Sequence, residues 1–126
     1  MRIKVYVAGP YSSDNIMSIL DNIKTGTTVC AQLMKMGFAP FCPWLDYQFH
    51  WYEKLTIDDY YEYSIAWLKV SDVMLALPRW ETSKGTLKEI KIAAGLDIPI
   101  VFLETFPNLD EVSEFIKQSY EKRGEL

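Results

Sequence analysis

Four short apolar runs alternate with segments of helical periodicity along this chain of 126 residues. Each run is short enough to be a strand, and its nearly continuous apolar character is typical of strands covered on both faces. Because parallel strands need a crossover between them, this alternation predicts a parallel sheet between helical layers. The expected strands are residues 3–8, 38–42, 73–77 and 98–103, and the expected helices begin at or near residues 14, 56, 86 and 108.

The predicted fold class is therefore α/β, with a doubly wound parallel sheet in three layers. Right-handed crossovers favour the strand order 2-1-3-4 and allow a further edge strand. Pro40 places the second run at an edge or a bulge, because proline cannot donate a ladder hydrogen bond. We find no repeat, low-complexity tract or linker, so residues 1–126 are expected to form one domain.

Composition and charge argue against several functional classes. A net charge of −4 does not suit a nucleic-acid polymer as partner, and no apolar run is long enough to cross a membrane. The chain begins directly with a strand-like run, so we expect no signal peptide. Cys30 and Cys42 are twelve positions apart and His50 is the one histidine. This spacing predicts free, buried thiols in a reducing cytoplasmic compartment, and no transition-metal site.

The stretch from Trp80 to Glu89 carries the strongest functional signal. It joins the third expected strand to a helix through a loop that contains Ser83 and Gly85. Backbone N–H groups at the start of a helix have no partner within the helix and can bind an anion. We therefore predict that this loop holds an anionic group of a substrate.

Glu89 falls on the apolar side of the helix that follows this loop. At about 100° per residue, Lys88 and Lys91 lie on the polar side, whereas Ile92 and Ala93 flank the glutamate. A carboxylate on an apolar face is costly unless it has partners or a chemical role. We interpret Glu89 as a nucleophile; the alternative is a carboxylate favoured by the helix dipole.

The loop after the first strand is the second candidate part of the site. In a sheet of order 2-1-3-4, ligands bind where the order reverses, at the carboxyl ends of the first and third strands. This loop supplies four candidate binding residues, Gly9, Pro10, Tyr11 and Ser12. A Gly-Pro pair is also typical of a simple turn, and a serine of a helix entry.

Aromatic residues are dense between Trp44 and Trp67. We expect most of them in the core and a minority in the wall of a flat, apolar pocket suited to a nucleobase. His50 is expected on a surface loop.

Three segments of the chain resemble the nucleoside 2-deoxyribosyltransferase superfamily, which includes the 2′-deoxynucleoside 5′-monophosphate N-hydrolases. They are residues 5–12, 67–75 and 83–89, and residues 98–101 fit as well. The resemblance spans nearly the whole chain, and its most specific part is the spacing between the third strand and the glutamate. It implies a flavodoxin-like fold and cleavage of the N-glycosidic bond of a (deoxy)nucleoside 5′-monophosphate, with no metal or cofactor. A neighbouring subunit of a homodimer or larger homo-oligomer would complete each site.

The resemblance also implies roles for single residues. The family's catalytic glutamate falls on Glu89, and the tyrosine that positions it falls on Tyr6. Ser83 stands where the monophosphate hydrolases have a phosphate-binding serine and the transferases an aspartate, and Gly85 follows in the same loop.

Two positions depart from the family pattern. Ser64 replaces an aspartate that assists the leaving base or the nucleophile, and Ser12 replaces an arginine of the hydrolases. Asp58, Asp59 and Glu62 on the same predicted helix are candidate substitutes for that aspartate. A base-exchanging nucleoside deoxyribosyltransferase and a non-catalytic nucleotide-binding module remain the alternatives.

Overall fold

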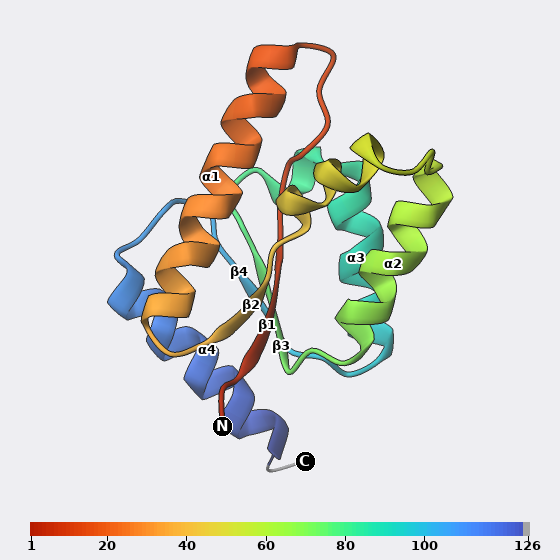
Figure 1. Ribbon diagram of the computed structural model, residues 1–126. Coiled ribbons are helices and arrows are strands. Elements are labelled where there is room, and N and C mark those ends of the chain that lie inside the picture. The colour runs from red at the N-terminus through yellow and green to blue at the C-terminus, as the bar shows by residue number, and fades with distance from the viewer. Residues whose placement is uncertain (125–126) are drawn as a thin grey trace.

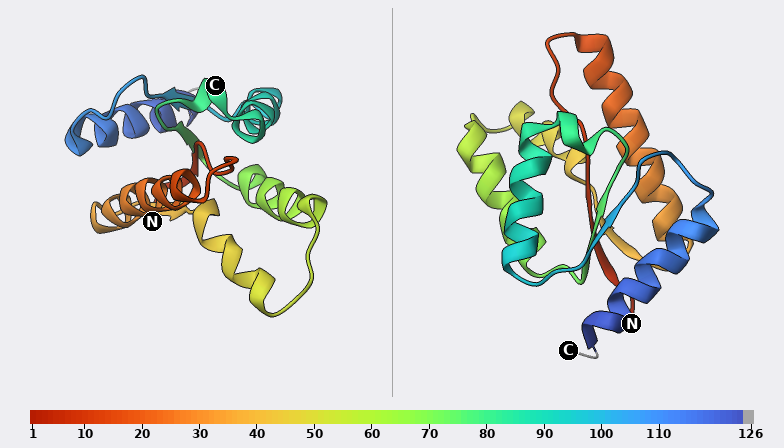
Figure 2. Two further views of the ribbon diagram at one scale, coloured as in Figure 1. Left: turned by 90° about the horizontal axis from the view of Figure 1, so that it is seen from above. Right: turned by 180° about the vertical axis from the view of Figure 1, so that it is seen from behind.

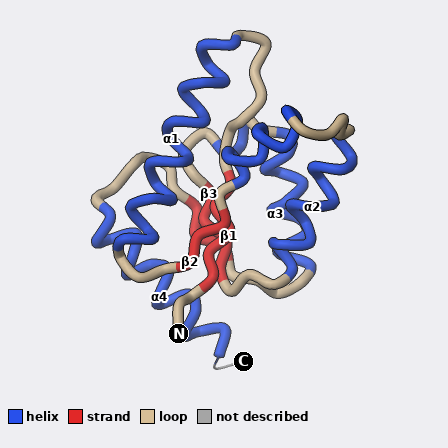
Figure 3. The backbone as a smooth tube through the Cα atoms, in the orientation of Figure 1, coloured by secondary structure: helices blue, strands red, loops and turns tan. Residues whose placement is uncertain are grey.

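The computed structural model describes residues 1–124 and has a four-stranded, all-parallel sheet at its centre (Figures 1 and 3). The strand order is β2-β1-β3-β4, which confirms the predicted order, and the described residues form no further edge strand. The fold is α/β and flavodoxin-like. Its strands are β1 (Lys4–Ala8), β2 (Ala39–Phe41), β3 (Val73–Ala76) and β4 (Ile100–Phe102).

Helices cover both faces of the sheet (Figure 2). One face packs against α1 (Ile16–Lys35) and α4 (Leu109–Gly124), and the other against α2 (Ile57–Lys69) and α3 (Lys84–Gly95). Two 3₁₀ helices, η1 (Pro43–Trp51) and η2 (Trp80–Thr82), follow the carboxyl ends of β2 and β3. Within residues 1–124, no helix combines the length and the apolar character that a bilayer crossing requires.

The alternation of side chains along β1 decides which residues reach the candidate site. Val5 and Val7 belong to the core beneath α1 and α4, whereas Tyr6 and Ala8 belong to the core beneath α2 and α3. Tyr6 is paired with Phe41 on β2 and with Met74 on β3. Because side chains alternate with a period of two, a slip of one residue would move Tyr6 to the opposite face.

Trp44 connects η1 to the rest of the molecule. Its side chain is 1% exposed and packs onto α1 at Gly26, where an added Cβ would come within 2.1 Å of the indole ring. Its indole Nε1 donates a hydrogen bond of 3.0 Å to the carbonyl of Pro10. The segment predicted as an aromatic loop is thus a 3₁₀ helix fixed between α1 and the loop after β1.

The expectation that most of the aromatic residues between Trp44 and Trp67 belong to the core is wrong. Trp44 is buried and Tyr60 and Tyr61 are half-buried, but the rest are exposed, among them Trp51 at 69%. The reason is geometric, because η1 lies beyond the carboxyl end of the edge strand β2 and α2 covers one face of a short sheet. Each can turn only one side toward the core.

Two helix starts differ from their predicted positions. Asn15 rather than Asp14 caps α1, since its side chain accepts from the backbone N–H of Met17 at 2.8 Å. The third helix begins at Lys84, not at residue 86, because the Ser83 side chain already provides the cap. Ends shift by one or two residues when several capping side chains stand in a row.

Other local predictions are confirmed. A helix begins near residue 56 as predicted, where Thr56 and Asp59 form a capping box at the start of α2. Asn108, one of two predicted caps for α4, accepts a hydrogen bond of 3.0 Å from the backbone N–H of Glu111. Both cysteines are free thiols, and Cys30 is buried as predicted, whereas Cys42 is only half-buried.

Candidate active site

A pocket of about 620 Å³ lies beyond the carboxyl ends of β1, β2 and β3, on the side of the sheet covered by α2 and α3. Most of the site residues predicted from the sequence line it, although they come from four separate segments. They are Tyr6 on β1, Tyr11 and Ser12 in the next loop, Ser64 on α2, and Gly85 and Glu89 on α3.

Three predicted residues do not line this pocket. Gly9 packs against the core, where an added Cβ would come within 3.1 Å of the Leu77 side chain. Pro10 turns its carbonyl toward the indole of Trp44. The Ser83 hydroxyl accepts hydrogen bonds from the Thr86 backbone N–H at 3.3 Å and hydroxyl at 2.9 Å. An N-cap side chain bonds back to its own helix, and therefore Ser83 stabilises the start of α3.

Glu89 is half-buried, and its Oε2 atom is fully buried without a hydrogen-bond partner among the described residues. Burial raises the pKa of this carboxyl from 4.5 to about 7, although the neighbouring Tyr6 hydroxyl partly opposes the rise. Desolvation disfavours the charged form of a carboxyl group. The side chain predicted to be a nucleophile is thus a poorly solvated carboxylate above neutral pH.

Tyr6 lies directly beside Glu89. Its ring is completely buried and stacks on Phe41, with the ring centroids 5.2 Å apart. Burial and the nearby Glu89 raise the pKa of the hydroxyl, while Ser64 has the opposite effect. The hydroxyl therefore stays protonated, and it can donate a hydrogen bond toward Glu89 or a ligand.

Buried polar atoms without partners concentrate in this pocket. Such atoms are uncommon in folded proteins, and each calls for an explanation. The Tyr60 hydroxyl joins Tyr6 Oη and Glu89 Oε2, so that three of the five such side-chain atoms in the described residues belong to residues that line the pocket. A ligand with donors and acceptors of its own would satisfy all three groups.

The remaining wall of the pocket is apolar and aromatic. It is formed by η1 and by the segment that leads into α2, and includes Tyr47, Trp51, Leu55 and Ile57. Flat aromatic and aliphatic surfaces of this kind suit a planar ring system. The pocket therefore has a carboxylate end, at Glu89, and an aromatic end.

Asp46 is the site residue that sequence analysis did not identify. It is half-buried on η1, lines the pocket and accepts a hydrogen bond of 3.0 Å from the Tyr11 hydroxyl. The available signal was an acid within an otherwise aromatic and apolar segment. The substitutes proposed for the missing family aspartate lie elsewhere, since Asp58, Asp59 and Glu62 are exposed and do not line the pocket.

Of the two exposed residues His50 and Lys84, only His50 lines the pocket. His50 is exposed on η1, as expected of a surface residue, yet it also lines the pocket. Lys84 is exposed and does not line the pocket. Within residues 1–124, no group of three or more His, Cys, Asp or Glu side chains is arranged to hold a metal ion.

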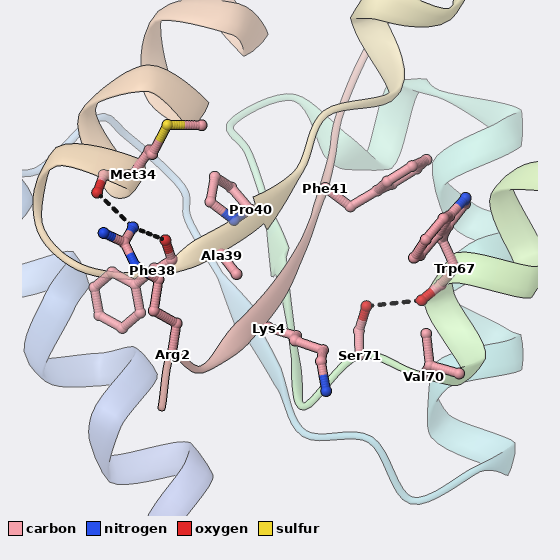
Figure 4. Close-up of a pocket in the computed structure, with 10 residues that line it drawn as sticks. All are labelled: Arg2, Lys4, Met34, Phe38, Ala39, Pro40, Phe41, Trp67, Val70 and Ser71. Atoms are coloured by element: carbon pink, nitrogen blue, oxygen red, sulfur yellow. Dashed lines mark hydrogen bonds between the residues drawn. The ribbon is translucent and has the colours of Figure 1, made fainter.

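A second cavity, of about 550 Å³, lies beside the edge strand β2 (Figure 4). Two basic residues, Arg2 and Lys4, line it. Arg2 has a structural role, because its Nη1 donates to the carbonyls of Met34 at 3.0 Å and Phe38 at 2.8 Å. None of the residues that line it is acidic. The cavity therefore lacks the unpartnered carboxylate and hydroxyl groups that distinguish the pocket around Glu89.

Comparison with known proteins places the whole pocket in a single family. Residues 3–102 match the family model described as a domain of unknown function, DUF4406. The chain belongs to the DUF4406 family. All residues that line the pocket fall within the matched range, whereas α4 follows it, so the DUF4406 match includes every element of the candidate site. No curated protein matches the chain.

The Glu89→Gln variant should be more stable than the natural chain at pH 8. The unfolded state loses the Glu89 proton near pH 4.5 but the folded state only near pH 7, so stability falls as pH rises between these values. This difference between the folded-state and unfolded-state pKa of Glu89 lowers the free energy of unfolding at pH 8 by at most about 3 kcal/mol. Urea unfolding at pH 4 and pH 8 should show the gain at pH 8 alone. Glu62→Gln on the exposed side of α2 is the matched control; an equal gain there would contradict the interpretation.

Proposed function

We propose that this protein cleaves the N-glycosidic bond of a (deoxy)nucleoside 5′-monophosphate with Glu89 as nucleophile. The observation that carries the proposal is the buried, unpartnered carboxylate oxygen of Glu89 beside the unpartnered hydroxyl of Tyr6, in a pocket with an aromatic wall. Burying these groups destabilises the fold unless a ligand uses them. The resemblance of the sequence to nucleotide N-hydrolases supports the same reaction.

The reaction would proceed in two steps. The Glu89 carboxylate attacks the anomeric carbon, and the base departs with the electron pair of the broken C–N bond. The transition state resembles an oxocarbenium ion and leads to a glycosyl ester on Glu89, which water then hydrolyses. The Tyr6 hydroxyl would hold Glu89 in the attacking orientation. Poor solvation of the carboxylate favours attack, because little hydration has to be removed.

The phosphate would bind at the start of α3 and at the loop after β1. Gly85 lies in the first turn of α3 and lines the pocket, and no atom lies within 4 Å of where a Cβ would stand. This leaves room for an anion to approach the free backbone N–H groups of the helix. Ser12 lines the same pocket and can donate a hydroxyl hydrogen bond.

We also propose a homo-oligomer in which a second subunit covers the open pocket. Ile16, Met17 and Leu20 on the first turns of α1 are all more than half exposed, and this end of the helix projects beyond the sheet (Figure 1). Light scattering should then give a multiple of the chain mass.

The free thiols suit a reducing, cytoplasmic environment.

The decisive experiment is an assay of base release. The protein should be incubated with each common ribo- and deoxyribonucleoside monophosphate, and the products separated by chromatography. Free base and sugar phosphate are expected. Exchange with an added second base would instead identify a transferase, and saturable quenching of tryptophan fluorescence without release would identify a binding module. Neither release nor binding for any nucleotide would contradict the proposal.

A further inference from the structure

Asp46 is a second carboxyl group in the pocket that contains Glu89. It lies on η1, whereas Glu89 lies on α3, and both line the same pocket. The Tyr11 hydroxyl donates to Asp46 Oδ1 at 3.0 Å, which fixes the orientation of the carboxyl group. The buried Trp44, two positions earlier, anchors this part of η1. Asp46 is therefore held in place by the hydrogen bond from Tyr11 and by the anchoring of η1 at Trp44.

Asp46 also lies at the aromatic end of the pocket. Tyr47 is its neighbour on η1, and Tyr60 on α2 and Tyr47 both act on the pKa of the Tyr11 hydroxyl that binds Asp46. Tyr47 and Tyr60 therefore lie near the Tyr11 hydroxyl that binds Asp46. A planar base that occupied this end would present its ring nitrogens to Asp46, while the sugar carbon extended toward Glu89.

Departure of a base from a sugar needs a proton, since the base leaves with the bonding electron pair. The titratable side chains that line the pocket are Tyr6, Tyr11, Asp46, Tyr47, His50, Tyr60, Tyr61 and Glu89. Burial raises the pKa of the hydroxyls of Tyr6, Tyr11 and Tyr61, so these groups are poor acids. Glu89 is the nucleophile, and the Ser64 hydroxyl is too weak an acid. Tyr47 and Tyr60 are phenols, which are weaker acids than a carboxylic acid. Asp46 and the exposed His50 remain.

We propose that Asp46 is the catalytic acid that protonates the departing base, an inference that rests on the proposed glycosidic cleavage. The O–H proton of Asp46 passes to a base nitrogen as the C–N bond breaks, which leaves the Asp46 carboxylate. In the second step water attacks the anomeric carbon, its proton returns to Asp46, and the Glu89 carboxylate is released. The net change is the addition of one water across the glycosidic bond, and both side chains regain their starting protonation.

The environment of Asp46 suits this role. Burial raises the pKa of its carboxyl group, which keeps a larger fraction protonated than in water. The hydrogen bond from Tyr11 partly lowers this pKa, because it stabilises the carboxylate that forms when the proton is given up. Asp46 would thus take over the work of the family aspartate that Ser64 replaces.

The test compares Asp46→Asn with the natural chain on two substrates. Asparagine keeps the shape of the side chain and can still accept from Tyr11, but it cannot donate an acidic proton. With the best nucleoside monophosphate, kcat should fall at least a hundredfold. With 4-nitrophenyl 2-deoxyribose 5-phosphate, whose leaving group needs no proton, the loss should be less than about fivefold. Gln48→Ala, at an exposed position of η1 outside the pocket lining, is the control and should lose little on either substrate. A loss for His50→Gln confined to the nucleotide would assign the acid to His50 and overturn the role of Asp46.

A second variant supplies an independent readout. Tyr11→Phe removes the hydrogen bond that lowers the pKa of Asp46, so one limb of the pH–rate profile should move to higher pH while the other stays in place. Equal losses of Asp46→Asn on both substrates, or no loss on either, would overturn the role of Asp46. A pH–rate profile that is the same for Tyr11→Phe as for the natural chain would also overturn the role of Asp46. If the natural chain cleaves neither substrate, it is the proposed function that fails.

Discussion

Replacement of Glu89 by alanine should slow base release at least a hundredfold. The variant removes the group that would form the glycosyl ester, and each factor of ten in rate corresponds to about 1.4 kcal/mol of activation free energy. A hundredfold loss therefore means that the enclosed carboxylate lowers the barrier by about 3 kcal/mol or more. Initial rates with the best nucleotide substrate, measured by chromatography of the released base, give the comparison directly.

Two further variants separate chemistry from folding. Glu89→Gln preserves the volume of the side chain and should lose as much activity as alanine, because an amide is not a comparable nucleophile. Lys91→Ala changes an exposed residue of the same helix and should retain nearly full activity. If Glu89→Ala releases base as fast as the natural chain, Glu89 is not the nucleophile.

The Gly26→Ala variant should be the most destabilising of the glycine-to-alanine substitutions. The new Cβ would lie 2.1 to 2.4 Å from three atoms of the Trp44 ring, which is almost fully buried and cannot move aside without disturbing the core. Overpacking of this severity costs about 3 kcal/mol. For a domain of this size, the midpoint of thermal unfolding should fall by roughly 10 °C.

Gly95→Ala is the matched control for Gly26→Ala. Gly95 also belongs to a helix, but no atom lies within 4 Å of where its Cβ would stand. Alanine there should stabilise the chain by about 0.5 kcal/mol, since glycine loses more backbone entropy on folding. Calorimetry of both variants should show shifts of opposite sign. Similar small shifts would mean that Trp44 can repack around an added methyl group.

Most of the fold could be predicted because its signals are local and agree with one another. The apolar runs at residues 3–8 and 73–77 are nearly continuous, as burial on both faces requires, and they became the two central strands. The alternating helices and the handedness of crossovers then left few strand orders. Helix ends were less certain, because Asp14 and Asn15 are both suitable caps and only the local backbone selects between them.

The candidate site was predictable to a lesser degree. Glu89 and Tyr6 could be placed together because the period of the helix and the order of the strands put them on one side of the sheet. The sequence alone does not decide the role of Ser83, because a serine at a helix start has the same signature whether it binds an anion or caps the helix; the structure shows the cap. Asp46 carried no periodic signal, since 3₁₀ helices are short and irregular.

The sequence by itself determined the parallel sheet, its order and the placement of Glu89 on the inner side of α3, because periodicity and connection rules act along the chain. Only the tertiary structure decided which polar groups meet. Asp46 reaches the pocket because Trp44 is seated on Gly26 and fixes η1 there, and its partner Tyr11 comes from a segment 35 positions away. Contacts of that kind depend on how side chains fill space between distant segments, and no local pattern records them.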